Sequence, residues 1–220
     1  MAITPDSVRE LLHSEDYGDR LRAVNQFREL DLGAAFDLAQ LAANDGNARV
    51  RYAAISQLAT LGQHDLATVE PLLRRALTND PEPDVQAAAA DAIGGLRLRS
   101  AYGDLAAVYH GTGEWLVQFS IVATLGELGE PQAFDLLQDA VRADNDLVVT
   151  AAIGALGELQ DKRAIPLLLS FTDHPDWQVR HRLVQALAQF SQPETQAALM
   201  ALAQDSSSIV AEAAAHHRIT

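Results

Sequence analysis

Trp177, Arg180 and His181 bring three kinds of chemistry to one short stretch of the chain. An indole ring stacks on flat conjugated molecules, a guanidinium group binds carboxylates in bidentate fashion, and an imidazole transfers protons near neutral pH. The surrounding sequence, HPDWQVRHRLVQALAQF, begins with a turn and continues with an apolar stripe at helical spacing. The pattern therefore predicts an amphipathic helix whose first turn carries all three side chains. The buried stripe is predicted to consist of Val179, Leu183, Val184 and Leu187.

This helix is one copy of a pattern that recurs along the whole chain. A valine followed by small residues and spaced apolar residues occurs at positions 50, 85, 117, 148, 179 and 210, and Arg or Gln directly follows it in four of these six copies. Each copy follows a shorter apolar segment and a turn rich in Asn, Asp, Pro and Gly. A helix pair repeated at this period is typical of an α-solenoid, in which each unit buries its apolar face on its neighbours. We predict an all-α superhelix of six to seven helix pairs, forming a single domain over residues 1–220 with capping repeats at both ends.

Alignment of the copies places chemically similar side chains in the same columns near the start of the second helix. One column holds both tryptophans, another holds three arginines and two glutamines, and a third holds two aromatic rings and a histidine. Residues one turn apart lie on one helix face, so a ring and its neighbour can flank one spot. The predicted ligand- or partner-binding groove consists of Arg20, Arg51, Tyr52, Trp115, Gln118, Phe119, Trp177, Arg180 and His181.

Each of these columns also has a structural explanation. The tryptophans can pack against the turn of the neighbouring unit, and the arginines can bond inter-repeat loops or Asp side chains. His181 can be an ordinary exposed polar residue. Tyr52 and Phe119 can belong either to the core between repeats or to a groove. Both interpretations stay open on the sequence alone.

Composition and motifs exclude several classes of function. The chain has no cysteine, which rules out disulfides, a thiolate nucleophile and cysteine metal sites. The seven histidines form no metal-binding pair, and no phosphate-binding or nucleophile motif is present, so we expect no metal and assign no catalytic residue. A net charge of −14 disfavours nucleic acid as a partner. The apolar runs are too short to span a membrane, and we expect a cytoplasmic protein without membrane insertion.

Two segments carry a resemblance to a known family. WLVQFSIVATLGELGEPQAF and LVVTAAIGALGELQDKRAIPLL resemble the short HEAT-like repeats of the E/F-type phycobilin lyases. The order of the motifs along the chain resembles the branch of that family that acts in phycobilisome degradation in cyanobacteria. In HEAT-like solenoids the second helices line the concave side, so the resemblance implies that the columns face a concave groove.

The resemblance also implies a function. It implies binding of phycobiliprotein subunits (phycocyanin and allophycocyanin) and of their bilin, with phycocyanobilin as a ligand that is not permanently bound. The protein would be located in the cytoplasm, near phycobilisomes that are attached to thylakoids. In a bilin-detaching reaction the thiol would belong to the client, His181, Tyr52 or Tyr17 would assist proton transfer, and the arginines would hold the propionates. The alternative is an adaptor without catalytic activity. A third class, resembling alkylpurine DNA glycosylases, fits the length but not the charge.

Overall fold

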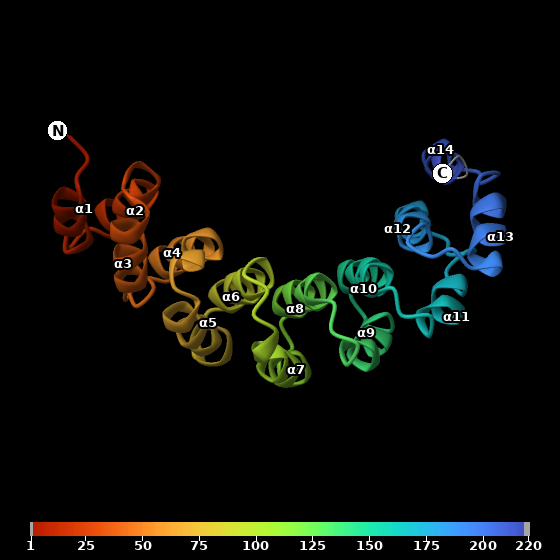
Figure 1. The fold of residues 1–220 in the computed structure, drawn as a ribbon, viewed down its shortest axis with the longest axis horizontal. Helices are drawn as coiled ribbons and strands as arrows, with labels where there is room; N and C mark the ends of the chain where they lie inside the picture. Colours follow the sequence, from red (N-terminus) through yellow and green to blue (C-terminus); the bar gives the residue numbers. More distant parts are fainter. Residues whose placement is uncertain (1, 218–220) are drawn as a thin grey trace. The chain divides into compact units, whose positions relative to one another are not determined.

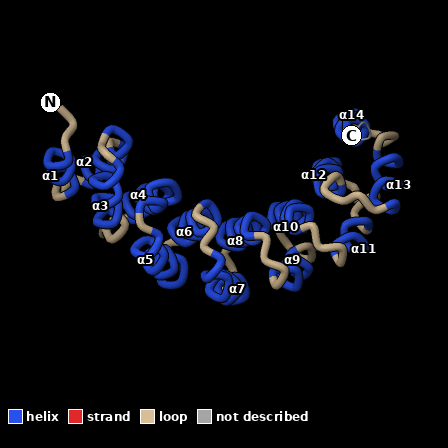
Figure 2. Tube along the Cα trace, viewed as in Figure 1, coloured by secondary structure: helices blue, strands red, loops and turns tan. Residues whose placement is uncertain are grey.

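Every regular element in the described part of the chain, residues 2–217 of the computed structural model, is a helix (Figure 2). The chain divides into two compact units, Met1–Thr124 and Leu125–Thr220. Unit 1 contains α1 (Pro5–Leu12), α2 (Tyr17–Asn25), η1 (Phe27–Glu29), α3 (Leu32–Ala42), α4 (Ala48–Leu61), η2 (Gly62–His64), α5 (Leu66–Asn79), α6 (Pro83–Gly95), η3 (Arg99–Ala101), α7 (Tyr102–Gly111) and the beginning of α8 (Trp115–Leu128). Unit 2 contains the end of α8, α9 (Ala133–Ala140), α10 (Asp146–Leu159), α11 (Ala164–Leu169), α12 (Trp177–Leu187), α13 (Pro193–Leu202) and α14 (Ser208–His216).

The α-helices of the described residues form consecutive pairs, from α1 and α2 to α13 and α14. In unit 1 the helices α3, α5 and α7 lie along one side, and α2, α4 and α6 lie along the other (Figure 1). Unit 2 has the same arrangement, with α9, α11 and α13 on one side and α10, α12 and α14 on the other (Figure 1). The predicted all-α solenoid class of six to seven helix pairs is confirmed. The prediction of one domain over residues 1–220 stays a prediction.

The second helix of each later pair begins where the turn residues predict it. Asn47, Asn145 and Asp176 are N-cap residues whose side chains accept a hydrogen bond from a backbone N–H of the first turn. Glu82 and Ser207 also occupy N-cap positions, but their side chains make no cap hydrogen bond. Caps therefore fix the start of α4, α10 and α12, and set the position of the side chains that follow.

The apolar stripe of the second helices forms the core of each unit. In α12 all four predicted residues of the stripe are buried, as are Val50, Ala54 and Leu58 in α4, whereas Leu61 at the end of α4 is half-buried. Neighbouring second helices are also linked through polar atoms, because Gln57 of α4 donates a hydrogen bond to the carbonyl oxygen of Val24 in α2. To bury this stripe, each second helix must turn its apolar face toward the neighbouring helices. The opposite face of each second helix remains available for other contacts.

Gly126, Gly129 and Gly157 lie near the ends of second helices, where a glycine commonly caps the helix, but only Gly129 is in a capping position. Gly129 adopts a left-handed conformation with φ of 64° and follows the end of α8, as a C-cap glycine does. Gly126 and Gly157 lie inside α8 and α10 instead. A Cβ atom on Gly157 would lie 2.6 Å from the Cα atom of Ala186 in α12. These two glycines allow adjacent second helices to pack closely.

The structure also bears on the expected absence of membrane insertion. None of the helices in residues 2–217 is both long and apolar enough to cross a membrane.

Candidate functional site

Arg180 holds the turn of its own repeat and the turn of the next repeat together. Its Nε and Nη2 atoms donate to the two carboxylate oxygens of Asp205 at 2.7 and 2.8 Å. Its Nη1 atom donates to the carbonyl oxygens of His174 and Pro175 at 2.6 and 3.1 Å. The side chains of Arg180 and Asp205 are only 11% and 8% exposed. Such a bidentate pair fixes both the distance and the orientation of the two turns.

Arg20 and Arg51 make the same set of contacts in unit 1. Arg20 binds Asp45 in bidentate fashion, and Arg51 binds Asp80. Each also donates from Nη1 to two carbonyl oxygens of its own turn. The arginines of this column therefore bond Asp side chains and carbonyl groups of the turns, which is the structural role considered for them from the sequence. With the carboxylate-binding edge of all three guanidinium groups occupied by aspartate, these arginines are not available to grip a ligand propionate.

Gln118 keeps part of the arginine pattern. Its side-chain nitrogen donates to the carbonyl oxygen of Thr112, six residues earlier. In the repeat of Arg180, the equivalent carbonyl belongs to His174 and accepts from Nη1 of the arginine. A glutamine is shorter than an arginine and carries no charge. It steadies its own turn in the way that the arginines do, and its proposed role toward a ligand stays a prediction.

The aspartates that receive the arginines were not singled out from the sequence, yet the repeat carries a signal for them. Each arginine stands 25 or 29 residues before its aspartate. Other repeats lack both partners of the pair. Thr112 replaces the aspartate in the turn that follows Gln86, and His174 replaces it in the turn that follows Val149. The same aspartates accept a hydrogen bond from the backbone N–H two residues later, at the start of the next second helix. Comparison of the two columns would have predicted the pairs.

The pairing of Arg180 with Asp205 also shifts the pKa of both groups. Hydrogen bonding and the positive charge of Arg180 hold the pKa of Asp205 below its ordinary value, against the opposing effect of partial burial. Hydrogen bonding to Asp205 raises the pKa of the Arg180 guanidinium in return. Both groups stay charged across the physiological pH range.

The aromatic side chains of the predicted groove have a different environment from the arginines. Trp115 and Trp177 occupy the first position of α8 and α12 and are 43% and 39% exposed. Tyr52 in α4 is 48% exposed. Phe119 and His181, one turn after the tryptophans, are half-buried. The tryptophans are therefore not packed away in the core, and the second helices present large apolar surfaces near their N-terminal ends.

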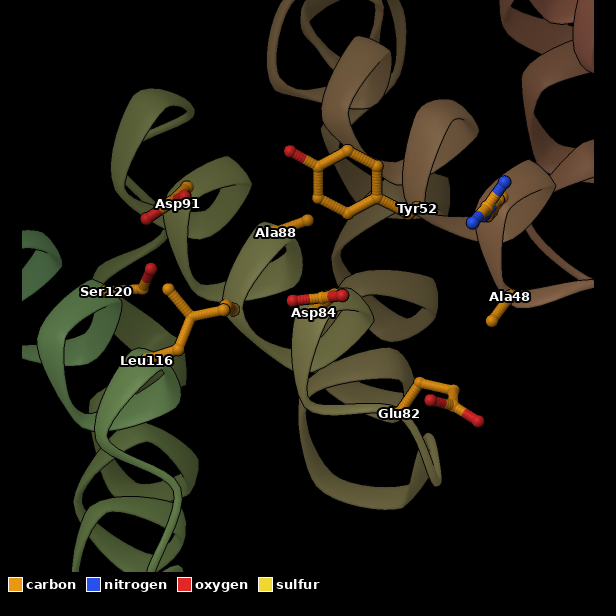
Figure 3. A pocket seen from close by; sticks show the side chains of 10 residues that line it. Ala48, Tyr52, Glu82, Asp84, Ala88, Asp91, Leu116 and Ser120 are labelled. Carbon is orange, nitrogen blue, oxygen red and sulfur yellow. The ribbon is translucent and has the colours of Figure 1, made fainter.

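A cleft of about 310 Å³ in unit 1 is the place where a predicted groove residue meets other elements. Figure 3 shows Asp84, Ala88 and Asp91 along one face of α6, with the ring of Tyr52 on one side and Leu116 on the other. The full lining comprises Ala48, Arg49, Tyr52, Glu82, Asp84, Ala87, Ala88, Asp91, Leu116 and Ser120. The cleft thus combines a ring, an apolar floor and several carboxylates.

Carboxylates dominate the charge of this cleft. Of the described residues that line it, Glu82, Asp84 and Asp91 are acidic, and Arg49 carries the only formal positive charge. Partial burial raises the pKa of Asp91, and a hydrogen bond with the Ser120 hydroxyl partly opposes this shift. A negatively charged cleft repels carboxylate groups of a ligand. The cleft does not have the charge expected of a propionate-binding site.

Arg51 and Tyr52 are adjacent in sequence but contribute to different surfaces. Tyr52 lines the cleft with α6 and α8, whereas Arg51 lines a separate hollow with Asp80 and the end of α5. The predicted site residues therefore include arginines that brace the turns and exposed aromatic rings near the start of the second helices. Trp177, Arg180 and His181 lie in unit 2 and the other predicted residues lie in unit 1, and a single groove that includes all of them stays a prediction.

No three His, Asp or Glu side chains of residues 2–217 are grouped so that they could hold a metal ion.

Comparison with known proteins decides the family. A comparison with curated proteins finds no match. A family model described as HEAT repeats matches residues 69–156 and 149–217. The chain belongs to the HEAT-repeat family.

This HEAT-repeat chain is similar in fold to several solved structures. The complex of CpcE and CpcF of phycocyanin lyase from Nostoc sp. PCC7120 matches with a TM-score of 0.64 and 22% identity, covering 100% of this chain and 95% of that one. YibA of E. coli matches with a TM-score of 0.70 and 17% identity, covering 98% and 82%. A HEAT-like repeat protein from Thermococcus onnurineus NA1 matches with a TM-score of 0.58 and 13% identity, covering 100% and 97%. At these identities the likeness concerns the fold.

Proposed function

We propose that this HEAT-repeat protein is a phycobilisome degradation factor of the NblB type, which binds phycobiliproteins and their bilin chromophores through exposed aromatic side chains of its second helices. It acts in the cytoplasm, beside thylakoid-attached phycobilisomes, on phycocyanin or allophycocyanin subunits. The order of its motifs along the chain supports this proposal. The likeness in fold to the CpcE and CpcF complex over the full chain is consistent with it.

One observation carries the proposal most directly. The exposed large aromatic side chains of the described residues all belong to second helices, and none belongs to a first helix. They are Tyr17 of α2, Tyr52 of α4, Trp115 of α8 and Trp177 of α12. Rings repeated in this way match a flat conjugated chromophore or an aromatic-rich protein surface, because both offer faces for stacking. Exposed aliphatic side chains do not share this distribution, since Leu32, Leu66 and Met200 belong to first helices.

A bilin-detaching reaction would place most of its chemistry on the client. This chain has no cysteine, so the thioether sulfur belongs to the phycobiliprotein. Cleavage by elimination breaks the carbon–sulfur bond, takes a proton from the neighbouring carbon and returns a thiol to the client. His181, half-buried on α12 one turn after Trp177, is the proposed proton carrier, with Tyr52 or Tyr17 as the alternatives.

A second function, protein binding without catalysis, is favoured by a specific observation. Arg20, Arg51 and Arg180 are bound to aspartates, and the cleft beside Tyr52 is acidic. These three guanidinium groups are thus already paired with carboxylates, and the exposed rings offer stacking surfaces but no charge for the propionates of a bilin. An adaptor that engages the protein part of a phycobiliprotein needs no such groups.

Replacement of Trp177 and of His181 separates the two functions. We expect Trp177→Ala to weaken binding of holo-phycocyanin about tenfold or more, since a centrally placed tryptophan contributes about 2 kcal/mol or more to an interface. In a bilin-detaching protein His181→Ala retains binding and loses bilin release; in an adaptor it changes neither. Binding is measured by calorimetry, and release is followed by bilin absorbance.

Met200→Ala provides the matched control. Met200 is 51% exposed but lies on α13, a first helix of unit 2, and its removal is expected to leave binding unchanged. Equal losses of affinity for Trp177→Ala and Met200→Ala would contradict a special role for the exposed aromatic side chains of the second helices.

A further inference from the structure

The cleft between α4, α6 and α8 exists because α6 carries unusually small side chains. The column that holds Tyr52 in α4 and Phe119 in α8 holds Ala87 in α6, and the next residue is Ala88. Both alanines are nearly buried and form the floor, while Tyr52 and Leu116 rise on either side. The volume of about 310 Å³ lies at the lower end of the range of small-ligand sites, about 300–1,000 Å³. One side chain of a partner fits such a space.

The two carboxylates of α6 stand at the two ends of this alanine floor. Asp84 and Asp91 are seven residues apart in one helix, which places them on the same face, roughly 10 Å apart along the axis. The sticks in Figure 3 lie on either side of Ala88, with the Tyr52 ring facing the same space. Ser120 of α8 lines the cleft on the side of Asp91. A guest in the cleft therefore meets a ring, an apolar floor and a carboxylate at once.

We propose that this cleft binds an arginine side chain of a partner protein. The aliphatic stem of an arginine packs on Ala87 and Ala88, and its planar guanidinium group stacks on Tyr52 while it donates to Asp84 or Asp91. The negative charge of the lining and the net charge of −14 both favour a positively charged guest. A carboxylate-bearing guest is repelled. The inference concerns unit 1 alone and does not depend on the identity of the partner proposed above.

The acidic group at the α8 end of the cleft is compatible with the same guest. Desolvation by neighbouring atoms raises the pKa of Asp91, although its side chain is exposed, and an incoming cation opposes this effect. The other polar or charged groups that line the cleft include Ser120 of α8, Asp84 on the same helix as Asp91, and Tyr52 and Arg49 of α4. Only Arg49 is cationic among them, and it is exposed to solvent.

The test uses capped arginine and its neutral isostere, capped citrulline, as probes. Isotope-labelled protein is titrated with each probe, and backbone amide shifts are followed by NMR. We expect capped arginine to give saturable shifts at Tyr52, Ala87, Ala88 and Ser120, with a dissociation constant of about a millimolar, and capped citrulline to give none. Shifts of equal size with both probes would overturn the proposal, because the charge would then play no part.

Single substitutions localise the effect. Asp91→Asn is expected to weaken binding of capped arginine about fivefold or more, and Tyr52→Ala by a similar factor. Asp37→Asn, which removes one exposed carboxylate of α3 outside the cleft, is the matched control for net charge and should change binding less than about twofold. The same spectra report whether each variant is folded. If Asp91→Asn and Asp37→Asn have equal effects, the cleft is not the binding site.

Discussion

Gly157→Ala is expected to destabilise unit 2 by about 2 kcal/mol. The new Cβ atom would lie 2.6 Å from Cα and 2.9 Å from Cβ of Ala186, so α10 and α12 would have to move apart. Overpacking of this kind costs about 1–3 kcal/mol, and contact with backbone atoms places it at the upper end. The helix preference of alanine over glycine returns only about 1 kcal/mol. Urea unfolding, followed by Trp177 fluorescence in a Trp115→Phe background, measures the change.

Gly154→Ala, one turn earlier in the same helix, is the matched control. Its Cβ atom would meet Cδ of Arg182 at 3.4 Å, and this side chain can move. We therefore expect a gain in stability of about 0.5–1 kcal/mol from helix preference. If the two variants have the same unfolding midpoint, close packing at Gly157 does not hold α10 against α12.

Arg180→Ala is expected to lower the free energy of unfolding by about 2–3 kcal/mol. The substitution removes four hydrogen bonds and leaves the nearly buried carboxylate of Asp205 without its partner. Lysine should restore less than half of the loss, because a single ammonium group cannot form the bidentate pair and contact two carbonyls. Arg22→Ala, which breaks a largely exposed ion pair with Asp19, should cost less than about 0.5 kcal/mol. Equal losses for Arg180→Ala and Arg22→Ala would contradict the bracing role.

The stability difference between Arg180→Ala and the wild type should depend on pH in one direction. The pKa of Asp205 is lowered in the folded protein, so its pairing stabilises the fold fully above the unfolded value of about 3.9. As the pH falls through the folded pKa, the carboxylate is protonated and the stabilisation is lost. The difference should be constant from about pH 7 to about pH 5 and shrink at about pH 3. A difference that stays the same at about pH 3 would show that charge pairing contributes little.

The helix pairs follow from the sequence because local signals and periodicity agree. Asn47, Asn145 and Asp176 cap helices at the predicted positions, and the stripe of α12 is buried as its spacing predicts. Gly157 illustrates what local rules miss, because a glycine near a helix end resembles a C-cap. Its actual role depends on how close Ala186 of another repeat approaches, and that distance is a tertiary property.

The candidate site could be predicted only in part, for a similar reason. A column of arginines is equally suited to a ligand carboxylate and to an aspartate, and only the placement of Asp45, Asp80 and Asp205 decides between them. The exposure of Trp115 and Trp177 likewise depends on how neighbouring repeats pack. The cleft beside Tyr52 was not anticipated, since it results from the absence of side-chain volume at Ala87 and Ala88 rather than from a motif.

The most direct test of the proposed function is binding of purified holo-phycocyanin by the wild-type protein, measured by calorimetry together with the bilin absorption spectrum. We expect a dissociation constant of about 10 µM or below, together with a change in the bilin band if the chromophore itself is engaged. Binding with an unchanged spectrum supports the adaptor form of the proposal. No heat of binding at roughly 100 µM of both proteins, with an unchanged spectrum, would contradict the proposal that this HEAT-repeat chain acts on phycobiliproteins.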